Sequence, residues 1–450
     1  MTTTAELAAF VQEADLSELS VDAVEEAKKR VLDSVGIALG AVGEQPVEIV
    51  RQTALEVSGG GSVRIWRSDE GVSPPDAAMV NTALTRYLDF MDSFLAPGET
   101  PHPSDNVGAA VAAADYTDAS GADLLAAIAA AYELQGELAW NAPVRDRGWD
   151  HVTHTVITQA AAASKLLGLD YEETRNAIGI AGTAHNALRV TRTGGINEWK
   201  GLASANAARN GVYAAMLAGN GTEGPVDLFE GQKGWQAVIS GEFEVDLDPG
   251  CPRLFDVMTK RYVAETYAHS AVEGVIELAE QEAIDPGDVE EIRLHTFAGA
   301  KLIIGGGEGS RYEVETKAQA DHSLPYMLAA ALVDRQMLNE QYDPERIARD
   351  DVQTLLRTVE VEADDDLTAR FEAGEMPAVV DVTMADGTTY RVEKASFSGH
   401  PNNPMTWAQL EEKFRAMAST VYDEERQDEI VAVVRDLEDL ETADLVAVLD

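Results

Sequence analysis

The first 240 residues of this chain form a succession of alanine-rich, periodically apolar segments, and this pattern restricts the fold more than any other feature. Between residues 21 and 40, apolar side chains recur mostly at spacings of three and four, which is typical of a helix, and Gly40 then ends it. Alanine favours helix and lets helices pack closely, so we expect a large all-helical domain with some helices buried on every side. Further helices are predicted after the prolines at 74 and 75 and over 107–116, 122–140, 155–167, 171–186 and 201–218.

The pattern changes after about residue 265. One more helix, over 270–283, precedes β-rich segments at 289–297, 358–362 and 378–384. Asp386-Gly387 then indicates a hairpin to a last strand at 389–393, and the tail returns to helix after residue 400. The predicted fold class is therefore mostly α with a smaller α+β domain. We place the helical domain at 1–265 and 400–450, and an α+β lid domain at 266–399.

The charge of the chain narrows the classes of partner. Asp and Glu number 79 against 34 Lys and Arg, a net charge of −45, while 45% apolar residues argue against a disordered acidic chain. Such a charge repels nucleic acid and anionic lipid, so we expect neither as a partner. Dispersed acid with only 10 Lys against 24 Arg favours adaptation to high salt, where screening weakens self-repulsion. The alternative is an ordinary acidic cytosolic protein.

A single cysteine, Cys251, limits the chemistry further. It cannot by itself hold an iron–sulfur cluster, a Cys-type zinc ion or an intrachain disulfide, so we expect no cofactor and chemistry by His, Lys, Arg, Asp, Glu or Tyr. Nucleotide-binding, nucleophile-elbow and HExxH motifs are absent. The N-terminus lacks the layout of a signal peptide, and no apolar run approaches the length of about 18 residues that a membrane helix needs. We expect a soluble, cytoplasmic protein.

One window departs from the acidic background. Between His151 and Thr222, six basic residues stand against four acidic ones, a balance of +2 that leaves −47 for the rest of the chain. Burial in the core or in a subunit interface would explain the missing acid, and the retained cations favour a site for an anionic substrate. Both explanations can hold together. The basic residues are Lys165, Arg175, Arg189, Arg192, Lys200 and Arg209.

An irregular segment at 88–106 is the second candidate. Prolines at 97, 101 and 103 prevent helix there, and such loops concentrate functional groups. The segment carries Asp92 and His102, and a histidine near a carboxylate is suited to proton transfer. The structural alternative is that Ser104 or Asp105 only caps the helix that begins near Val107.

The remaining histidines and their neighbours form weaker candidates. His151 and His154 are spaced for one helix face, but no carboxylate stands at helical spacing to complete a metal site. Lys260 and His269 lie near the predicted domain boundary, and closure of the two domains would bring them toward the first loop. Other candidates in the second domain are Asp321, His322 and Tyr326, whereas His185 and His295 are interpreted as packing or surface residues and His400 as part of a turn.

Together these segments resemble the MmgE/PrpD family, which contains 2-methylcitrate dehydratase, cis-aconitate decarboxylase and related enzymes. The match covers nearly the whole chain. The segments that carry it are RYLDFMD (86–92), HPSDN (102–106), GWDH (148–151), AAAASKLLGLD (160–170), RVTRTGGINEWKG (189–201), KRYVAETYAHSAVEG (260–274) and ADHSLPYM (320–327).

The resemblance implies a homodimer, a large helical domain, an α+β lid, and an active site between them that uses no metal or cluster. It implies a small di- or tricarboxylate as the substrate. The predicted catalytic residues are Asp92, His102, His151, Lys200, His269 and Tyr326. The predicted substrate-binding residues are Arg192, Lys260, His154 and His322.

The working reaction is the dehydration of a 2-hydroxy tricarboxylate, with 2-methylcitrate as the expected substrate. His102, oriented by Asp92, would remove the proton next to a carboxylate, and Lys200, Lys260 and Arg192 would stabilise the added charge. His151 or His269 would assist departure of the hydroxyl. HPSDN and GWDH resemble the dehydratase branch, whereas 260–274 fits the broader and decarboxylase pattern. Decarboxylation, epimerisation, a metal-dependent hydro-lyase and a non-catalytic binding protein stay open as alternatives.

Overall fold

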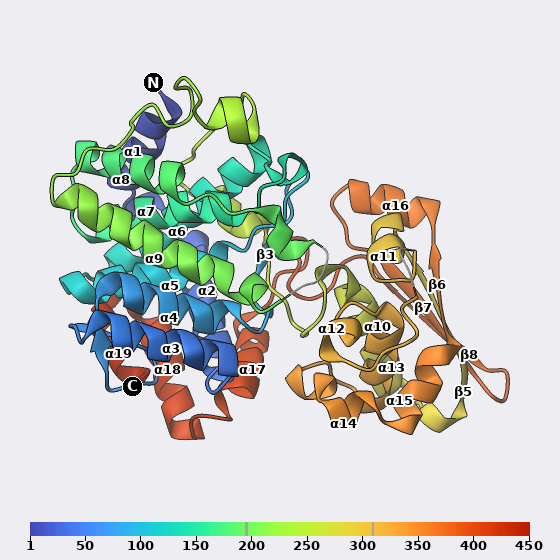
Figure 1. The fold of residues 1–450 in the computed structure, drawn as a ribbon. Helices are drawn as coiled ribbons and strands as arrows, with labels where there is room; N and C mark the ends of the chain where they lie inside the picture. The colour runs from blue at the N-terminus through green and yellow to red at the C-terminus, as the bar shows by residue number, and fades with distance from the viewer. Residues whose placement is uncertain (194–196, 308–309) are drawn as a thin grey trace. The chain divides into compact units, whose positions relative to one another are not determined.

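The computed structural model describes residues 1–193, 197–307 and 310–450 and divides the chain into two compact units (Figure 1). Unit 1 comprises Met1–Val257 and Thr406–Asp450, and unit 2 comprises Met258–Met405. Unit 1 is built almost entirely of helices, and unit 2 combines helices with a four-stranded sheet. The predicted fold class, mostly α with a smaller α+β part, is confirmed. Among the helices described, none is long and apolar enough to cross a lipid bilayer.

The helices of unit 1 begin where the sequence offers a capping side chain. Ser20 accepts a hydrogen bond from the Ala23 amide and Ser73 from that of Asp76, the latter with two prolines in the first turn. The helices are α1 (Thr3–Glu13), α2 (Val21–Gly40), α3 (Gln45–Ser58), α4 (Pro74–Arg86), α5 (Val107–Thr117), α6 (Gly121–Asn141), α7 (Val152–Leu166), α8 (Tyr171–Ala184), α9 (Trp199–Gly219), α17 (Trp407–Ala418), α18 (Glu424–Arg435) and α19 (Thr442–Val448). Short strands are β1 (Val63–Arg64), β2 (Gly71–Val72) and β3 (Ser93–Phe94).

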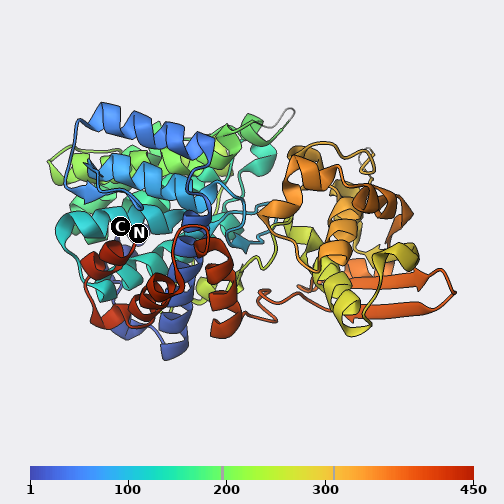
Figure 2. The ribbon, with the colours of Figure 1, turned by 90° about the horizontal axis from the view of Figure 1, so that it is seen from below.

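Small residues let the central helices of unit 1 approach closely. Helix α4 packs against α5 and α9, and α9 packs against α7; these helices run side by side in Figures 1 and 2. A Cβ on Gly108 would lie 2.6 Å from the Thr82 amide nitrogen, and one on Gly211 would lie 2.9 Å from the Gln159 Cβ. Both glycines are therefore required by the closeness of the helices, as the alanine-rich sequence predicts.

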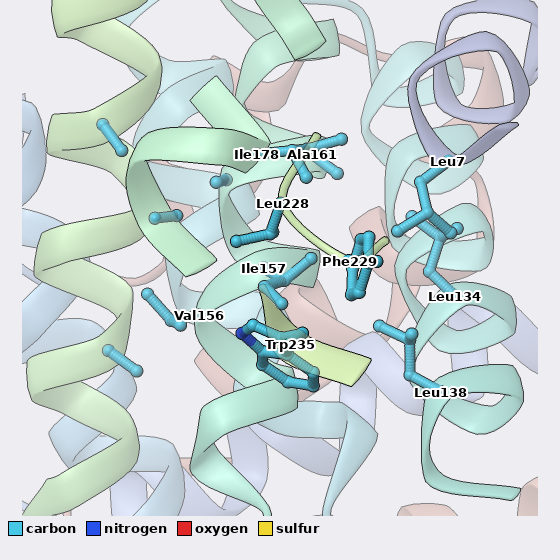
Figure 3. Close-up of a cluster of buried hydrophobic side chains, with 14 of the residues drawn as sticks. Leu7, Leu134, Leu138, Val156, Ile157, Ala161, Ile178, Leu228, Phe229 and Trp235 are labelled. Atoms are coloured by element: carbon cyan, nitrogen blue, oxygen red, sulfur yellow. The ribbon is translucent and has the colours of Figure 1, made fainter. Parts of the chain in front are cut away.

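An apolar core fills the space between α1, α6, α7 and α8 (Figure 3). Leu134 and Leu138, one turn apart on α6, face Phe229 and Trp235 from the segment that follows α9. The Trp235 indole donates its one hydrogen bond to the Gly182 carbonyl over 3.0 Å, so its polar atom is satisfied inside the core. This core supports α7, which carries His154 in its first turn and follows directly on His151.

The C-terminal segment completes unit 1 through a buried charge. Lys413 on α17 places its Nζ 2.6 Å from Asp33 Oδ1 on α2 and donates to the Phe90 carbonyl over 3.0 Å. Both charged side chains are buried, so each needs the other to offset the cost of desolvation. The second contact fixes the backbone of the loop after α4, which carries Asp92.

Unit 2 contains a sheet of order β6-β5-β7-β8. β5 pairs in parallel with β6 and antiparallel with β7, and β7 and β8 form the predicted hairpin. Helix α10 packs against β7 and β8, and α13 against β6. The strands of this sheet are β5 (Val289–Thr296), β6 (Val359–Ala363), β7 (Ala378–Met384) and β8 (Thr389–Lys394), while β4 (Val257–Met258) lies in the chain at the limit between the units. The helices are α10 (His269–Gln281), α11 (Ala298–Ile303), α12 (Lys317–Ala320), α13 (Leu324–Asp334), α14 (Pro344–Ile347), α15 (Asp350–Leu355) and α16 (Asp365–Glu372).

Unit 2 runs from Met258 to Met405, and backbone hydrogen bonds hold its first residues within it. The Thr259 amide donates to the Gly399 carbonyl over 2.7 Å, and the Val263 amide donates to that of Met337 over 2.9 Å. These bonds join residues 259 and 263 to unit 2, because their partners belong to it.

Candidate active site

The loop after α4 holds a buried carboxylate, Asp92. Its Oδ1 accepts hydrogen bonds from the Ser104 amide (3.1 Å) and hydroxyl (2.7 Å), and its Oδ2 accepts one from the Tyr132 hydroxyl (2.7 Å). Three donors therefore surround this carboxylate in the core of unit 1. The arrangement ties the two ends of the loop together and thereby positions His102, two residues before Ser104.

His102 is oriented by the backbone of Asp92. Its Nδ1 lies 2.6 Å from the Asp92 carbonyl oxygen and 3.4 Å from Ser93 Oγ. Because a carbonyl oxygen only accepts, Nδ1 carries the proton, and Nε2 of the neutral ring then carries the lone pair. The Asp92 carbonyl thus orients the His102 ring, whereas the Asp92 carboxylate is bonded to Ser104 and Tyr132.

His151 stands edge-on to His102, with ring centroids 5.4 Å apart and planes at 77°. Its Nδ1 lies 3.5 Å from Asp150 Oδ1, and its Nε2 lies 3.4 Å from Arg192 Nη2. Burial, followed by the charges of Arg192 and Arg86, lowers the pKa of His151 well below its usual range. The His151 ring is therefore uncharged at pH 7 in this structure. The reaction expected from the sequence had offered His151 as one of two possible proton donors.

Arg192 forms an ion pair with the buried Asp150, whose Oδ2 lies 2.5 Å from Arg192 Nε. Asp150 Oδ1 also accepts from the Val152 amide over 3.1 Å, at the beginning of α7. Arg192 therefore supports the His151 ring and neutralises Asp150. It is less available to a substrate carboxylate than the sequence suggested. Residues 194–196 of the same motif lie outside the described residues.

Lys200, in the first turn of α9, contacts the loop after α4 at Asp89. Its Nζ lies 3.2 Å from Asp89 Oδ2, and Arg86 Nη1 donates to Asp89 Oδ1 over 3.2 Å. One turn along α9, the Ser204 hydroxyl donates to Asp105 Oδ2 over 2.6 Å. Helix α9 thus meets the loop at two acidic residues.

Asp105 is not the helix cap that the sequence offered as an alternative. Asn106 occupies the N-cap position of α5, and no side chain caps the helix there among the described residues. Asp105 is buried, and Arg86 Nε lies 3.7 Å from its Oδ1. Burial raises the pKa of Asp105 to about 6, against the lowering effects of Arg86 and Ser204. Ser104, the other suggested cap, bonds Asp92 instead.

His154 belongs to the core rather than to this cluster. Its Nε2 lies 2.8 Å from the Ala142 carbonyl oxygen, and its ring packs 5.7 Å from that of Trp235. Burial lowers its pKa to about 4. The two histidines spaced for one helix face therefore separate, because His151 precedes α7 and His154 turns inward to α6. Among the described residues, no three metal-ligating side chains gather to hold an ion.

Unit 2 places its candidates in two settings. Lys260 is buried, and His269 begins α10 with its ring 4.7 Å from Phe397 and 6.0 Å from Tyr262. Tyr326 departs from its expected role, since it is fully buried and its hydroxyl donates to the Gln341 carbonyl. That hydroxyl is committed to the backbone rather than open to a ligand, and burial raises its pKa.

The other basic and histidine side chains lie in local contacts. Arg175 pairs with Glu172 and Arg209 with Asp76, so these two cations of the basic window do not join the loop cluster. His322 contacts Asp321 through Nδ1 over 2.6 Å. His400 accepts from the Asn402 amide within its turn, and burial lowers its pKa to about 4. His295 lies 3.4 Å from Glu362.

Sequence reasoning missed Arg86, Asp150 and Ser204, and it gave no separate role to Asp89, which lies in the candidate loop. Arg86 and Asp150 lie inside the quoted motifs 86–92 and 148–151, and Asp150 is next to a candidate histidine, which is the signal that could have found it. Ser204 carries no such signal, because its partner is 99 residues away. In unit 1 the arrangement offers a proton acceptor, His102, a neutral second ring, His151, and fixed cations nearby. This combination suits proton removal from a carbon next to a carboxylate.

Comparison with known proteins follows the same division of the chain. The model of the MmgE/PrpD N-terminal domain matches residues 5–248, and that of the MmgE/PrpD C-terminal domain matches residues 262–439. The 2-methylcitrate dehydratase of Escherichia coli (strain K12) is 28% identical, covering 91% of this chain and 89% of the relative. The cis-aconitate decarboxylase of Mus musculus is 26% identical, covering 97% and 91%. The mitochondrial 2-methylcitrate dehydratase of Yarrowia lipolytica is 27% identical, covering 81% and 74%.

Proposed function

This chain belongs to the MmgE/PrpD family, and from that premise we propose that it is a hydro-lyase that dehydrates a 2-hydroxy tricarboxylate without a metal. The substrate proposed is 2-methylcitrate and the product 2-methyl-cis-aconitate. The relatives named as 2-methylcitrate dehydratases support this choice. The observation that carries it is the placement of His102, whose Nδ1 is fixed by the Asp92 carbonyl.

In the proposed reaction, His102 Nε2 takes a proton from the carbon next to a substrate carboxylate. The electron pair of that C–H bond forms the new double bond as the C–O bond breaks, and the hydroxyl leaves as water after protonation. Lys200 and Lys260 would hold carboxylates and lower the energy of the extra negative charge. Because His151 is neutral in this structure, His269 is the proposed proton donor to the hydroxyl.

Decarboxylation of a cis-aconitate-type substrate is the second candidate. The specific observation in its favour is the cis-aconitate decarboxylase of Mus musculus, which aligns with 97% of this chain. Loss of CO₂ would leave a carbanion-like state of the same kind, which a protonated histidine would quench. Epimerisation needs the same proton removal, followed by the return of a proton to the opposite face of that carbon.

A substrate panel tests the proposal. The protein is incubated with 2-methylcitrate, citrate and cis-aconitate while ultraviolet absorbance reports a conjugated double bond and a second assay reports CO₂. We expect absorbance to rise with 2-methylcitrate, and we expect His102→Ala to reduce the rate by about 10²–10⁴-fold. Release of CO₂ from cis-aconitate alone would favour the decarboxylase, and full activity of both His102→Ala and Lys200→Ala would contradict the mechanism.

Two controls separate the remaining alternatives. Activity that a chelator abolishes would contradict the metal-independent reaction. No turnover of any acid, together with tight binding to another protein, would favour a non-catalytic binding protein.

A further inference from the structure

Two cations from different helices of unit 1 converge on a single carboxylate. Arg86, the last residue of α4, donates from Nη1 to Asp89 Oδ1 over 3.2 Å. Lys200, in the first turn of α9, lies 3.2 Å from Asp89 Oδ2. Each carboxylate oxygen therefore faces its own cation, which is how a site for a bound carboxylate is built.

The two cations differ in how much they depend on that carboxylate. The Arg86 side chain is 1% exposed and always charged, whereas that of Lys200 is 23% exposed. Arg86 Nε and Nη2 find no hydrogen-bond acceptor among the described residues. Asp105 Oδ1 lies 3.7 Å from Nε, and its carboxyl is protonated more readily than usual because it is buried. A buried guanidinium in this setting needs a firmly ionised carboxylate beside it.

Asp89 supplies that carboxylate from an unusual position. Its φ is +55°, in the left-handed region that side chains other than those of Asn and Asp rarely adopt. Its side chain is 41% exposed, so water reaches the ion pair and the net gain from the pair is small. Exchange of the Asp89 carboxylate for another carboxylate would therefore cost little.

We propose that Arg86 and Lys200 form the binding site for one carboxylate of the substrate, and that Asp89 occupies this site until the substrate displaces it. The inference rests on the proposed function, which supplies a substrate with several carboxylates. A tricarboxylate brings further contacts that Asp89 lacks, and those contacts drive the exchange. Arg86 then always has a carboxylate beside it, first that of Asp89 and then that of the substrate.

The charge of Asp89 is tested by Asp89→Asn, because Asn also tolerates the left-handed conformation. The measurement is the dissociation constant of propane-1,2,3-tricarboxylate, an unreactive tricarboxylate, by titration calorimetry at constant salt. We expect binding to tighten by about threefold to tenfold, since the competing carboxylate is gone. If Asp89 only holds Lys200 in place, binding weakens or stays the same, and either result overturns the inference.

Two further variants keep the test specific. Glu172→Gln removes one charge from another arginine-paired carboxylate, 64% exposed on α8, and should leave the dissociation constant unchanged. An equal tightening there would assign the effect to net charge and overturn the inference. In the Lys200→Met background, Asp89→Asn should tighten binding of the tricarboxylate by less than it does in the wild-type background. An equal tightening in both backgrounds would overturn the inference.

Folding and function are checked separately. Thermal melting establishes that each variant is folded, and Asp89→Gly, which suits the same φ, should tighten binding as Asp89→Asn does. A wild-type chain that binds neither propane-1,2,3-tricarboxylate nor any acid of the substrate panel would overturn the proposed function. Wild-type binding that Asp89→Asn does not tighten would overturn only the displacement of Asp89.

Discussion

At the scale of single residues, Glu133 on α6 is a buried carboxylate whose ionisation affects the stability of the fold. Its Oε2 accepts from the Arg253 amide over 2.9 Å. Burial raises the pKa of Glu133 to about 7, and the nearby Glu137 adds to the shift. Because the pKa is higher in the folded chain than in the unfolded chain, Glu133 contributes stability below pH 4.5. That contribution is lost as the pH rises toward 7.

We therefore expect Glu133→Gln to be more stable than the wild type at pH 8 and close to it at pH 5. Ionisation of Glu133 lowers the free energy of unfolding by on the order of 1 kcal/mol for each pH unit between the unfolded pKa and the folded pKa of about 7, and the variant avoids this loss. Urea unfolding at both pH values and at fixed salt measures the difference. Glu172→Gln, at an exposed carboxylate, is the control and should show no such pH dependence. A Glu133→Gln chain less stable than the wild type at pH 8 would contradict the prediction.

The residues of the candidate site could be predicted only where local sequence marks them. The prolines around His102 indicate an irregular loop, and the structure has one. The contact of His102 Nδ1 with the Asp92 carbonyl rather than its carboxylate depends on the path of the loop, which no local pattern encodes. Arg86 looks in sequence like an ordinary cation in the last turn of a helix. Its relation to Lys200 arises only when α4 and α9 pack together.

At the scale of elements, helix and strand limits set by local caps and turns were predictable. The helix predicted at 21–40 and the strand predicted at 378–384 have those limits in the structure. Helix α7 begins at Val152, three residues before its predicted start, because the buried Asp150 carboxylate accepts from the Val152 amide. That bond requires Arg192 to hold Asp150 in the core. The start of α7 therefore depends on a residue distant in sequence and could not be predicted from the local pattern.

Helix α9 and the turn before it carry exposed apolar side chains. Leu188, Val190, Trp199 and Tyr213 are exposed in a stretch with little acid. We propose that this face joins two copies of the chain, because an isolated subunit would leave it in water. Light scattering should give twice the chain mass of 48.3 kDa, falling to one chain in Val190→Glu with Tyr213→Glu. Leu302→Glu in unit 2 is the control, and a monomeric wild type would contradict the proposal.

At the scale of the whole molecule, the net charge of −45 predicts strong self-repulsion at low salt. We expect the melting temperature and activity to increase as KCl is raised from about 0.1 M to molar levels, because the screening length falls from about 10 Å to about 3 Å. Calorimetry in KCl, with sucrose of equal osmolality as the uncharged control, measures the effect. Activity that is full at low salt and collapses at molar salt would contradict adaptation to high salt.

The ion pair between Asp33 and Lys413 has a consequence for synthesis on the ribosome. Unit 2 lies between Asp33 and Lys413 in the sequence. Asp33 therefore leaves the ribosome before its partner, and residues 258–405 are translated in between. Until Lys413 follows, α2 lacks the cation beside its buried carboxylate and the loop carrying Asp92 lacks the tie at Phe90. Domains fold as they emerge, so the inserted unit can complete its own core first. The loop that carries Asp92 therefore gains its tie at Phe90 only after residue 413 has been synthesised.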